Sequence, residues 1–104
     1  MIHSIIVSRC LVFMLMLLAT GAVMAGDPMK GRPIYDIRCA GCHGTEGIPQ
    51  VAGIPNFKMG EGLMKPDQQL LSFVKKGKNV MPGFKGVLTD SEILDVIAHI
   101  RTFF

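Results

Sequence analysis

The sequence predicts an all-α domain of three to four short helices, because helical periodicity recurs along it and no segment needs to be a strand. Residues 89–92 have the form of a capping box, and the apolar residues after them recur at helical spacing to the end of the chain. A second helix is expected to open at Pro66 and Asp67, with proline in its first turn and an acid near the positive end of its dipole. It should end at Gly77. Its predicted buried face consists of Leu70, Leu71, Phe73 and Val74.

A third helix is expected earlier in the chain. Asp27 and Pro28 could start it, but Pro33 would be tolerated in a first turn and not deeper, so this helix is predicted to begin near Lys30 or Gly31 and to run to about Cys42. Gly31 and Tyr35 are four residues apart and share a face. A glycine and an aromatic residue on one face would let another helix cross closely.

The most specific motif is a pair of thiols separated by two residues and followed directly by a histidine: Cys39, Cys42 and His43. This spacing is the attachment pattern for c-type haem. Each cysteine closes a thioether onto a vinyl group, and the adjacent imidazole becomes the proximal iron ligand. The alternatives are a redox dithiol, a zinc half-site or a structural disulfide. A redox pair would want a strand–helix context and zinc would want a second ligand pair, and the chain offers neither.

Two stretches are predicted to be irregular loops, at residues 44–65 and 79–84. The first is rich in glycine and proline and has neither helical nor strand periodicity. A loop this long in a small domain needs something to pack against, and a buried haem supplies it. Residues 54–57, Ile-Pro-Asn-Phe, are apolar enough to lie on the porphyrin. A core of this size is marginal alone, so we expect the haem to be structural as well as functional.

A second axial ligand must come from a small set of side chains. Met81 is favoured because it precedes Pro82 in a rigid turn between two helices, far enough from His43 for the chain to pass round the haem edge. The methionines in the long loop also suit the role of flexible apolar fillers. His99 lies inside an apolar helical face, where a packed or half-exposed imidazole is expected. The other candidates for the second ligand are Met29, Met59, Met64 and His99.

Residues 1–25 are predicted to be a secretory signal peptide, leaving residues 26–104 as one small domain outside the cytoplasm. His3 and Arg9 precede an apolar run at residues 11–18, and small or apolar residues stand at the cleavage-determining positions. The alternative is an uncleaved membrane anchor. Arg9 interrupts the apolar segment and leaves about fifteen residues, short of the ~20 that span a bilayer. Cys10 would be removed with the peptide.

The charge is modestly positive, at a formal +3, and nothing in its distribution suggests nucleic acid binding. Four lysines fall close together, and these are Lys75, Lys76, Lys78 and Lys85. They have two compatible interpretations: a solvated helix end, where lysine stabilises the negative pole of the dipole, and a docking patch for an acidic redox partner. We expect a monomer.

The order of helix, Cys-x-x-Cys-His, Pro-Asn-Phe, helix, Met-Pro and capped terminal helix resembles the class I cytochromes c, particularly the small soluble monohaem carriers of bacteria. The resemblance covers nearly all of residues 26–104. It implies that Cys39 and Cys42 hold the haem, that His43 and Met81 ligate the iron, and that the carbonyl of Pro55 accepts a hydrogen bond from His43.

The resemblance also implies that the first and last helices cross, with Gly31 and Tyr35 meeting Val96 and His99. It implies a one-electron carrier of periplasmic location, without enzymatic activity, that exchanges electrons with periplasmic or membrane-bound redox proteins. One alternative is an accessory haem protein or subunit of a specific respiratory oxidoreductase, for example in nitrite respiration. The others are a small haem peroxidase and a gas sensor.

Overall fold

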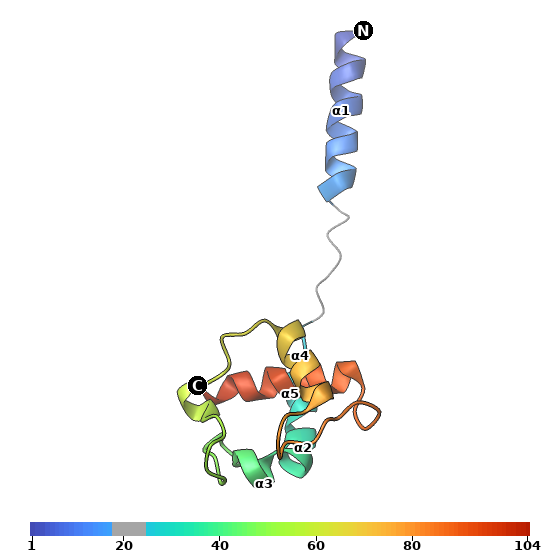
Figure 1. Ribbon diagram of the computed structural model, residues 1–104. Coiled ribbons are helices and arrows are strands. Elements are labelled where there is room, and N and C mark those ends of the chain that lie inside the picture. The colour runs from blue at the N-terminus through green and yellow to red at the C-terminus, as the bar shows by residue number, and fades with distance from the viewer. Residues whose placement is uncertain (18–24) are drawn as a thin grey trace.

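The computed structural model describes residues 1–17 and 25–104. Five α-helices occur in these residues: α1 (Ile2–Leu17), α2 (Pro28–Arg38), α3 (Ala40–His43), α4 (Asp67–Lys76) and α5 (Asp90–Ile100) (Figure 1). Two short 3₁₀ helices, η1 (Phe57–Met59) and η2 (Arg101–Phe103), complete the described elements. Within the described part the only β-type pairings are two isolated bridges. The predicted all-α class is confirmed.

Helix α1 belongs to the segment interpreted as a signal peptide. Its residues 2–14 are all exposed. No helix among the described residues is both long enough and apolar enough to cross a membrane. The cleavage site is predicted at residues 23–25, of which Val23 and Met24 lie outside the described residues.

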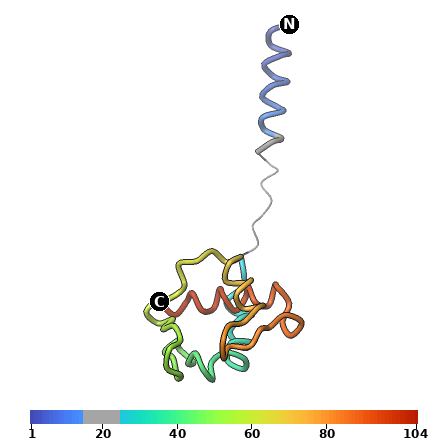
Figure 2. Tube along the Cα trace, viewed as in Figure 1, coloured from blue at the N-terminus to red at the C-terminus, as the bar shows by residue number. Residues whose placement is uncertain are grey.

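Helix α5 runs across the middle of the domain, with the 44–65 loop on one side and the 77–89 loop on the other (Figure 2). Its main partner is α2, and the two backbones approach most closely at Gly31. Tyr35 is fully buried at the same crossing and meets His99 edge-on, with ring centroids 5.3 Å apart. The crossing of the first and last helices of the domain is therefore where the sequence predicts it.

The start of α2 differs from the prediction. The helix begins at Pro28, and Pro33 lies in its interior. Asp27 caps it through a bond from the Met29 amide, and the Asp27 amide donates to Asp95 Oδ1 of α5 at 2.7 Å. This contact fixes the helix start early in the chain. Pro33 is tolerated because it is exposed, so water can satisfy the carbonyl that its missing amide would have bonded.

The buried residues form two clusters, and α5 contributes to both. One cluster contains Tyr35, Ala40, Leu63, Val96 and Ile100. The other contains Leu71, Phe84, Ile93 and Ile97. The predicted capping box at Thr89 and Glu92 is present and begins α5 as expected. Of the predicted α4 face, Leu71 is buried and Leu70 and Val74 are half-buried, whereas Phe73 is 40% exposed.

The far end of α5 is fastened to the loop before α4 by Arg101. Its guanidinium donates to the Leu63 and Lys65 carbonyls and to the carboxylate of Asp67, with the Nη2–Oδ1 contact at 2.7 Å. The half-exposed ion pair adds little by itself. The backbone bonds matter more, because they fix where the long loop returns to the helices.

Candidate functional site

The Cys-x-x-Cys-His residues form a single turn at the end of α2, made of Cys39 and the four residues of α3. Cys39 ends α2 with φ −124° and also starts α3, so the predicted continuous helix to Cys42 is broken at this residue. The His43 amide donates to the Cys39 carbonyl at 3.0 Å, which closes the turn. Both thiols are free, with Cys39 half-buried and Cys42 exposed. One rigid turn therefore carries the two thiols and the imidazole.

The environment of Cys39 does not suit a redox dithiol. Burial raises the pKa of its thiol to about 11. Reactive Cys-x-x-Cys pairs instead have a lowered thiol pKa that favours the thiolate. A neutral, half-buried thiol packed against the Tyr35 cluster is consistent with a covalent anchor.

His43 is half-buried and stacks on Phe57, with ring centroids 4.7 Å apart and planes 13° from parallel. Burial lowers the pKa of His43, so the imidazole is neutral and keeps a lone pair for a metal. Its Nδ1 atom is buried without a hydrogen-bond partner. Two free thiols and a neutral, half-buried imidazole whose buried Nδ1 has no partner fit a covalently attached haem.

The expected hydrogen bond from His43 to the Pro55 carbonyl is not present, since Nδ1 has no partner. The segment after Pro55 is instead held by local bonds. The Asn56 amide donates to Glu61 Oε2 at 2.8 Å, and the Asn56 side chain caps η1. The side chain that meets the imidazole is Phe57, which was predicted to lie on the porphyrin.

The loop around Met81 is tied to the end of α4. The Met81 and Lys78 backbones exchange hydrogen bonds of 3.0 and 3.1 Å across a turn whose Asn79 has φ +54°. The Phe84 amide then donates to the Val74 carbonyl at 3.0 Å. The loop lies so close to α4 that a Cβ at Gly77 would stand 2.5 Å from a backbone nitrogen. Met81 thus has a fixed backbone, as a ligand would require.

Met81 differs from the other methionines of the domain in how far its side chain is buried. Met81 is half-buried and packs against the Leu71 cluster. The other three methionines of the domain are exposed: Met29 is 80% exposed, Met59 74% and Met64 88%. His99 is half-buried between Tyr35 and Phe103, in agreement with a packing role.

The four lysines do not form one uniform patch. Lys75 is paired with Asp90, at 3.0 Å between Nζ and Oδ1, and is only half-exposed. Lys76, Lys78 and Lys85 are exposed. Sequence alone gave no sign of the pairing, because Asp90 belongs to the first turn of the next helix.

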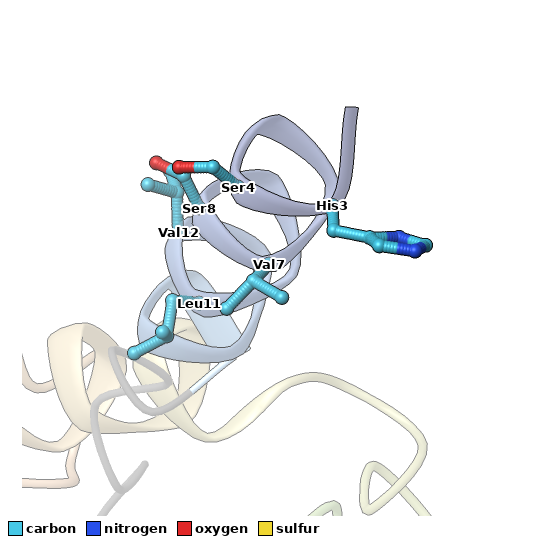
Figure 3. Close-up of a pocket in the computed structure, with 6 residues that line it drawn as sticks. All are labelled: His3, Ser4, Val7, Ser8, Leu11 and Val12. Atoms are coloured by element: carbon cyan, nitrogen blue, oxygen red, sulfur yellow. The ribbon is translucent and has the colours of Figure 1, made fainter. Parts of the chain in front are cut away.

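Two hollows lie outside the motif. One is open and lined only by residues of α1, from His3 to Val12, so it shares nothing with the thiol–imidazole turn (Figure 3). The other is polar and borders His99, with charged groups of both signs that include Arg32, Asp36 and Lys58. Neither contains a cysteine or a methionine.

Comparison with known proteins decides the family. Residues 26–100 match the family model described as cytochrome c oxidase, cbb3-type, subunit III. This chain belongs to that family of class I c-type cytochromes. Cytochrome c6 from Thermosynechococcus vestitus is 31% identical, over 90% of this chain and 87% of the relative. Cytochrome c6 from Thermostichus vulcanus is 32% identical, over 78% and 74%.

Solved structures agree with these matches. The cytochrome c6 of the diatom Phaeodactylum tricornutum superposes with a TM-score of 0.62 at 32% identity, over 74% of this chain and 93% of that one. The KustC0563 c-type cytochrome gives a TM-score of 0.64 at 26% identity, over 70% and 95%. The cofactor of this cytochrome is covalently bound haem c, and its function is electron transport.

Proposed function

We propose that this cytochrome shuttles one electron at a time between redox proteins outside the cytoplasm, with its haem iron held by His43 and Met81. Bound haem supplies the ferric/ferrous couple. The observation that carries the assignment is that Met81 is half-buried in a loop fixed to α4, whereas the other methionines of the domain are exposed. A thioether ligand favours the ferrous state and raises the potential.

Non-enzymatic function follows from this ligation. If His43 and Met81 hold the iron, they would leave no position free for oxygen or peroxide. The same two residues would hold it in both oxidation states, so little in the chain would have to move during electron exchange. His99, which a peroxidase would need as a distal acid–base group, is held between Tyr35 and Phe103.

Carbon monoxide distinguishes the carrier from the peroxidase and gas-sensor alternatives. The ferrous holoprotein should keep its absorption spectrum unchanged when the gas is added at neutral pH. A shifted Soret band with the unaltered chain would show an open iron position, and the carrier proposal would then be wrong.

A second candidate is a resident subunit of a respiratory oxidoreductase, supported by the description of the matching family. A carrier should purify as a monomer and bind its partners only at low salt. A subunit should stay with the other proteins of a complex through gel filtration at high salt.

Periplasmic location is proposed on the signal-like residues 1–25. Cleavage should leave a mature chain that begins at Gly26, and the intact mass of the exported holoprotein measures this directly. A mass that includes residues 1–25, together with retention in the membrane fraction, would indicate the uncleaved anchor instead.

Exchange of electrons is proposed to occur beside the Met81 loop, where Lys76, Lys78 and Lys85 are exposed. These charges would attract an acidic partner and raise its association rate, an effect that salt screens. Lys75 contributes less, because Asp90 neutralises it.

A further inference from the structure

We propose that Tyr35 is a positioning residue for the haem-binding turn, which it holds at both ends. Its backbone carbonyl accepts a hydrogen bond from the Cys39 amide at 2.9 Å, where the turn begins. Its hydroxyl donates to the Gly44 carbonyl at 2.7 Å, immediately after His43. The inference rests on haem attachment at residues 39–43 and does not depend on Met81 as the second ligand.

The position of the hydroxyl is set by the helix crossing and not by the turn. Tyr35 has no exposed surface. Its ring lies edge-on to His99 and to Phe103, with centroids 5.3 and 5.2 Å away. One turn earlier on the same face, Gly31 brings the α2 backbone against α5. The packing of α2 against α5 therefore sets the position of the Tyr35 hydroxyl, and this hydroxyl in turn holds Gly44, the residue after His43.

The hydroxyl has a task that a phenyl ring would not perform. Helix α3 has four residues, and a helix end leaves carbonyls that need a donor from elsewhere. Gly44 is buried, and its carbonyl accepts from the Gly47 amide at 3.2 Å as well as from the phenol at 2.7 Å, so removing the hydroxyl would leave this oxygen only the longer of its two bonds. The backbone there is also special, with φ +82°, and a Cβ would clash with the Ile48 carbonyl. Holding this carbonyl fixes the direction in which the chain leaves His43.

The test uses the holoprotein with Tyr35→Phe, which keeps the ring and removes the bond. Thr102→Val is the matched control: it removes a hydroxyl that donates to the His99 carbonyl at 2.6 Å, near the same crossing but without a hydrogen bond to the turn. Amide hydrogen exchange at His43 and Gly44 should become about tenfold faster in Tyr35→Phe. Exchange at the α4 amides should change much less, and the control should leave both sets unchanged.

A second readout reports on the ligand itself. The paramagnetically shifted ring protons of His43 in the ferric state should move in Tyr35→Phe and stay in place in Thr102→Val. A merely structural role would accelerate exchange equally at the turn and in α4 and leave these shifts unaltered. Either of those two results would overturn the proposal. Failure of the carrier function would appear separately, as binding of carbon monoxide by the unaltered protein.

Tyr35 is the chain's only tyrosine, so biosynthetic labelling with 3-fluorotyrosine places fluorine at this residue alone. The fluorinated phenol is more acidic and donates more strongly while the packing is kept. Exchange at the Gly44 amide should become measurably slower in the labelled holoprotein. This measurement decides the question if Tyr35→Phe fails to accumulate, and unchanged exchange would count against the proposal.

Discussion

Gly31 in α2 lies directly against the Asp95 carbonyl of α5, so closely that a Cβ on the glycine would stand 1.9 Å from that oxygen. The two helices can meet at this distance only because residue 31 has no side chain. The contact holds the Tyr35 ring in place one turn later and brings the first and last helices of the domain together.

Gly31→Ala should therefore destabilise the holoprotein by about 3 kcal/mol, since overpacking forces the backbones apart. The helix propensity of alanine, about 1 kcal/mol better than that of glycine, does not offset this. Gly41→Ala is the control, because a Cβ there meets nothing within 4 Å. Guanidinium unfolding of both variants measures the difference. If the two variants are equally stable, the close approach of the backbones at Gly31 does not limit the stability of the domain.

Met81→Ala should open the sixth iron position, lower the reduction potential and admit carbon monoxide, because the soft thioether ligand is lost. Met64→Ala is the matched control, being 88% exposed in the loop. Its spectrum and potential should equal those of the unaltered protein. Persistence of the sulfur-to-iron charge-transfer band in ferric Met81→Ala would transfer the ligand assignment to Met59 or Met64.

Charge reversal beside the Met81 loop should slow electron exchange with anions. Lys76→Glu combined with Lys78→Glu is expected to reduce the rate of oxidation by hexacyanoferrate about threefold to tenfold at low ionic strength and to flatten its salt dependence. The potential should stay nearly unchanged. Stopped-flow rates across an ionic-strength series measure this effect.

The control for that experiment carries the same change of net charge elsewhere. Lys30→Glu combined with Lys65→Glu alters two exposed lysines away from the Met81 loop. If both double variants slow the reaction equally, net charge and not a local patch determines the rate. A salt-independent rate in the unaltered protein would leave these lysines as a solvated helix end.

The pKa of Tyr35 should set a limit to stability at high pH. Burial raises this pKa well above its usual value, and the neighbouring Asp36 carboxylate raises it further. In the unfolded chain tyrosine ionises near pH 10. The contribution of Tyr35 to stability is therefore complete below about pH 10 and is lost as the pH rises above it.

Comparing the unfolding free energies of the unaltered protein and Tyr35→Phe from pH 8 to pH 12 isolates this effect, because the lysines titrate in both. The gap between them should narrow above about pH 10. A parallel decline of the two curves would show that the phenol titrates normally in the folded state.

Local signals in the sequence predicted the helices well. The capping box at Thr89 and the closing Gly77 act within a few residues, so neighbours along the chain contain the information. The predicted start of α2 was wrong because the exclusion of proline from a helix interior was given more weight than the local cap at Asp27, and because the Asp27 amide also bonds to Asp95, a residue 68 positions away. The bond between Asp27 and Asp95 forms only on folding, so the place of Pro33 in the sequence could not indicate it.

The features of the site also divide into those that local sequence spacing predicts and those that only tertiary packing creates. Cys39, Cys42 and His43 were identifiable because attachment of haem fixes their spacing along the chain. The Lys75–Asp90 pair, the Phe57 stack on His43 and the Arg101 clamp join separate segments, and their geometry comes from tertiary packing. The hydroxyl of Tyr35 was visible only as a choice of tyrosine over phenylalanine at a buried position, a signal without meaning until Gly44 is found beside it.

The pairing of α2 with α5 also constrains the order in which the domain is made. Helix α2 starts at Pro28 and α5 ends at Ile100, so their crossing joins opposite ends of the domain and cannot form until nearly the whole chain has been delivered. A chain in transit through an export channel would therefore not yet have formed the crossing of α2 and α5. The thiol–imidazole turn follows α2 directly, so it would emerge among the first parts of the domain and stay reachable for haem before the last helix arrives to cover it.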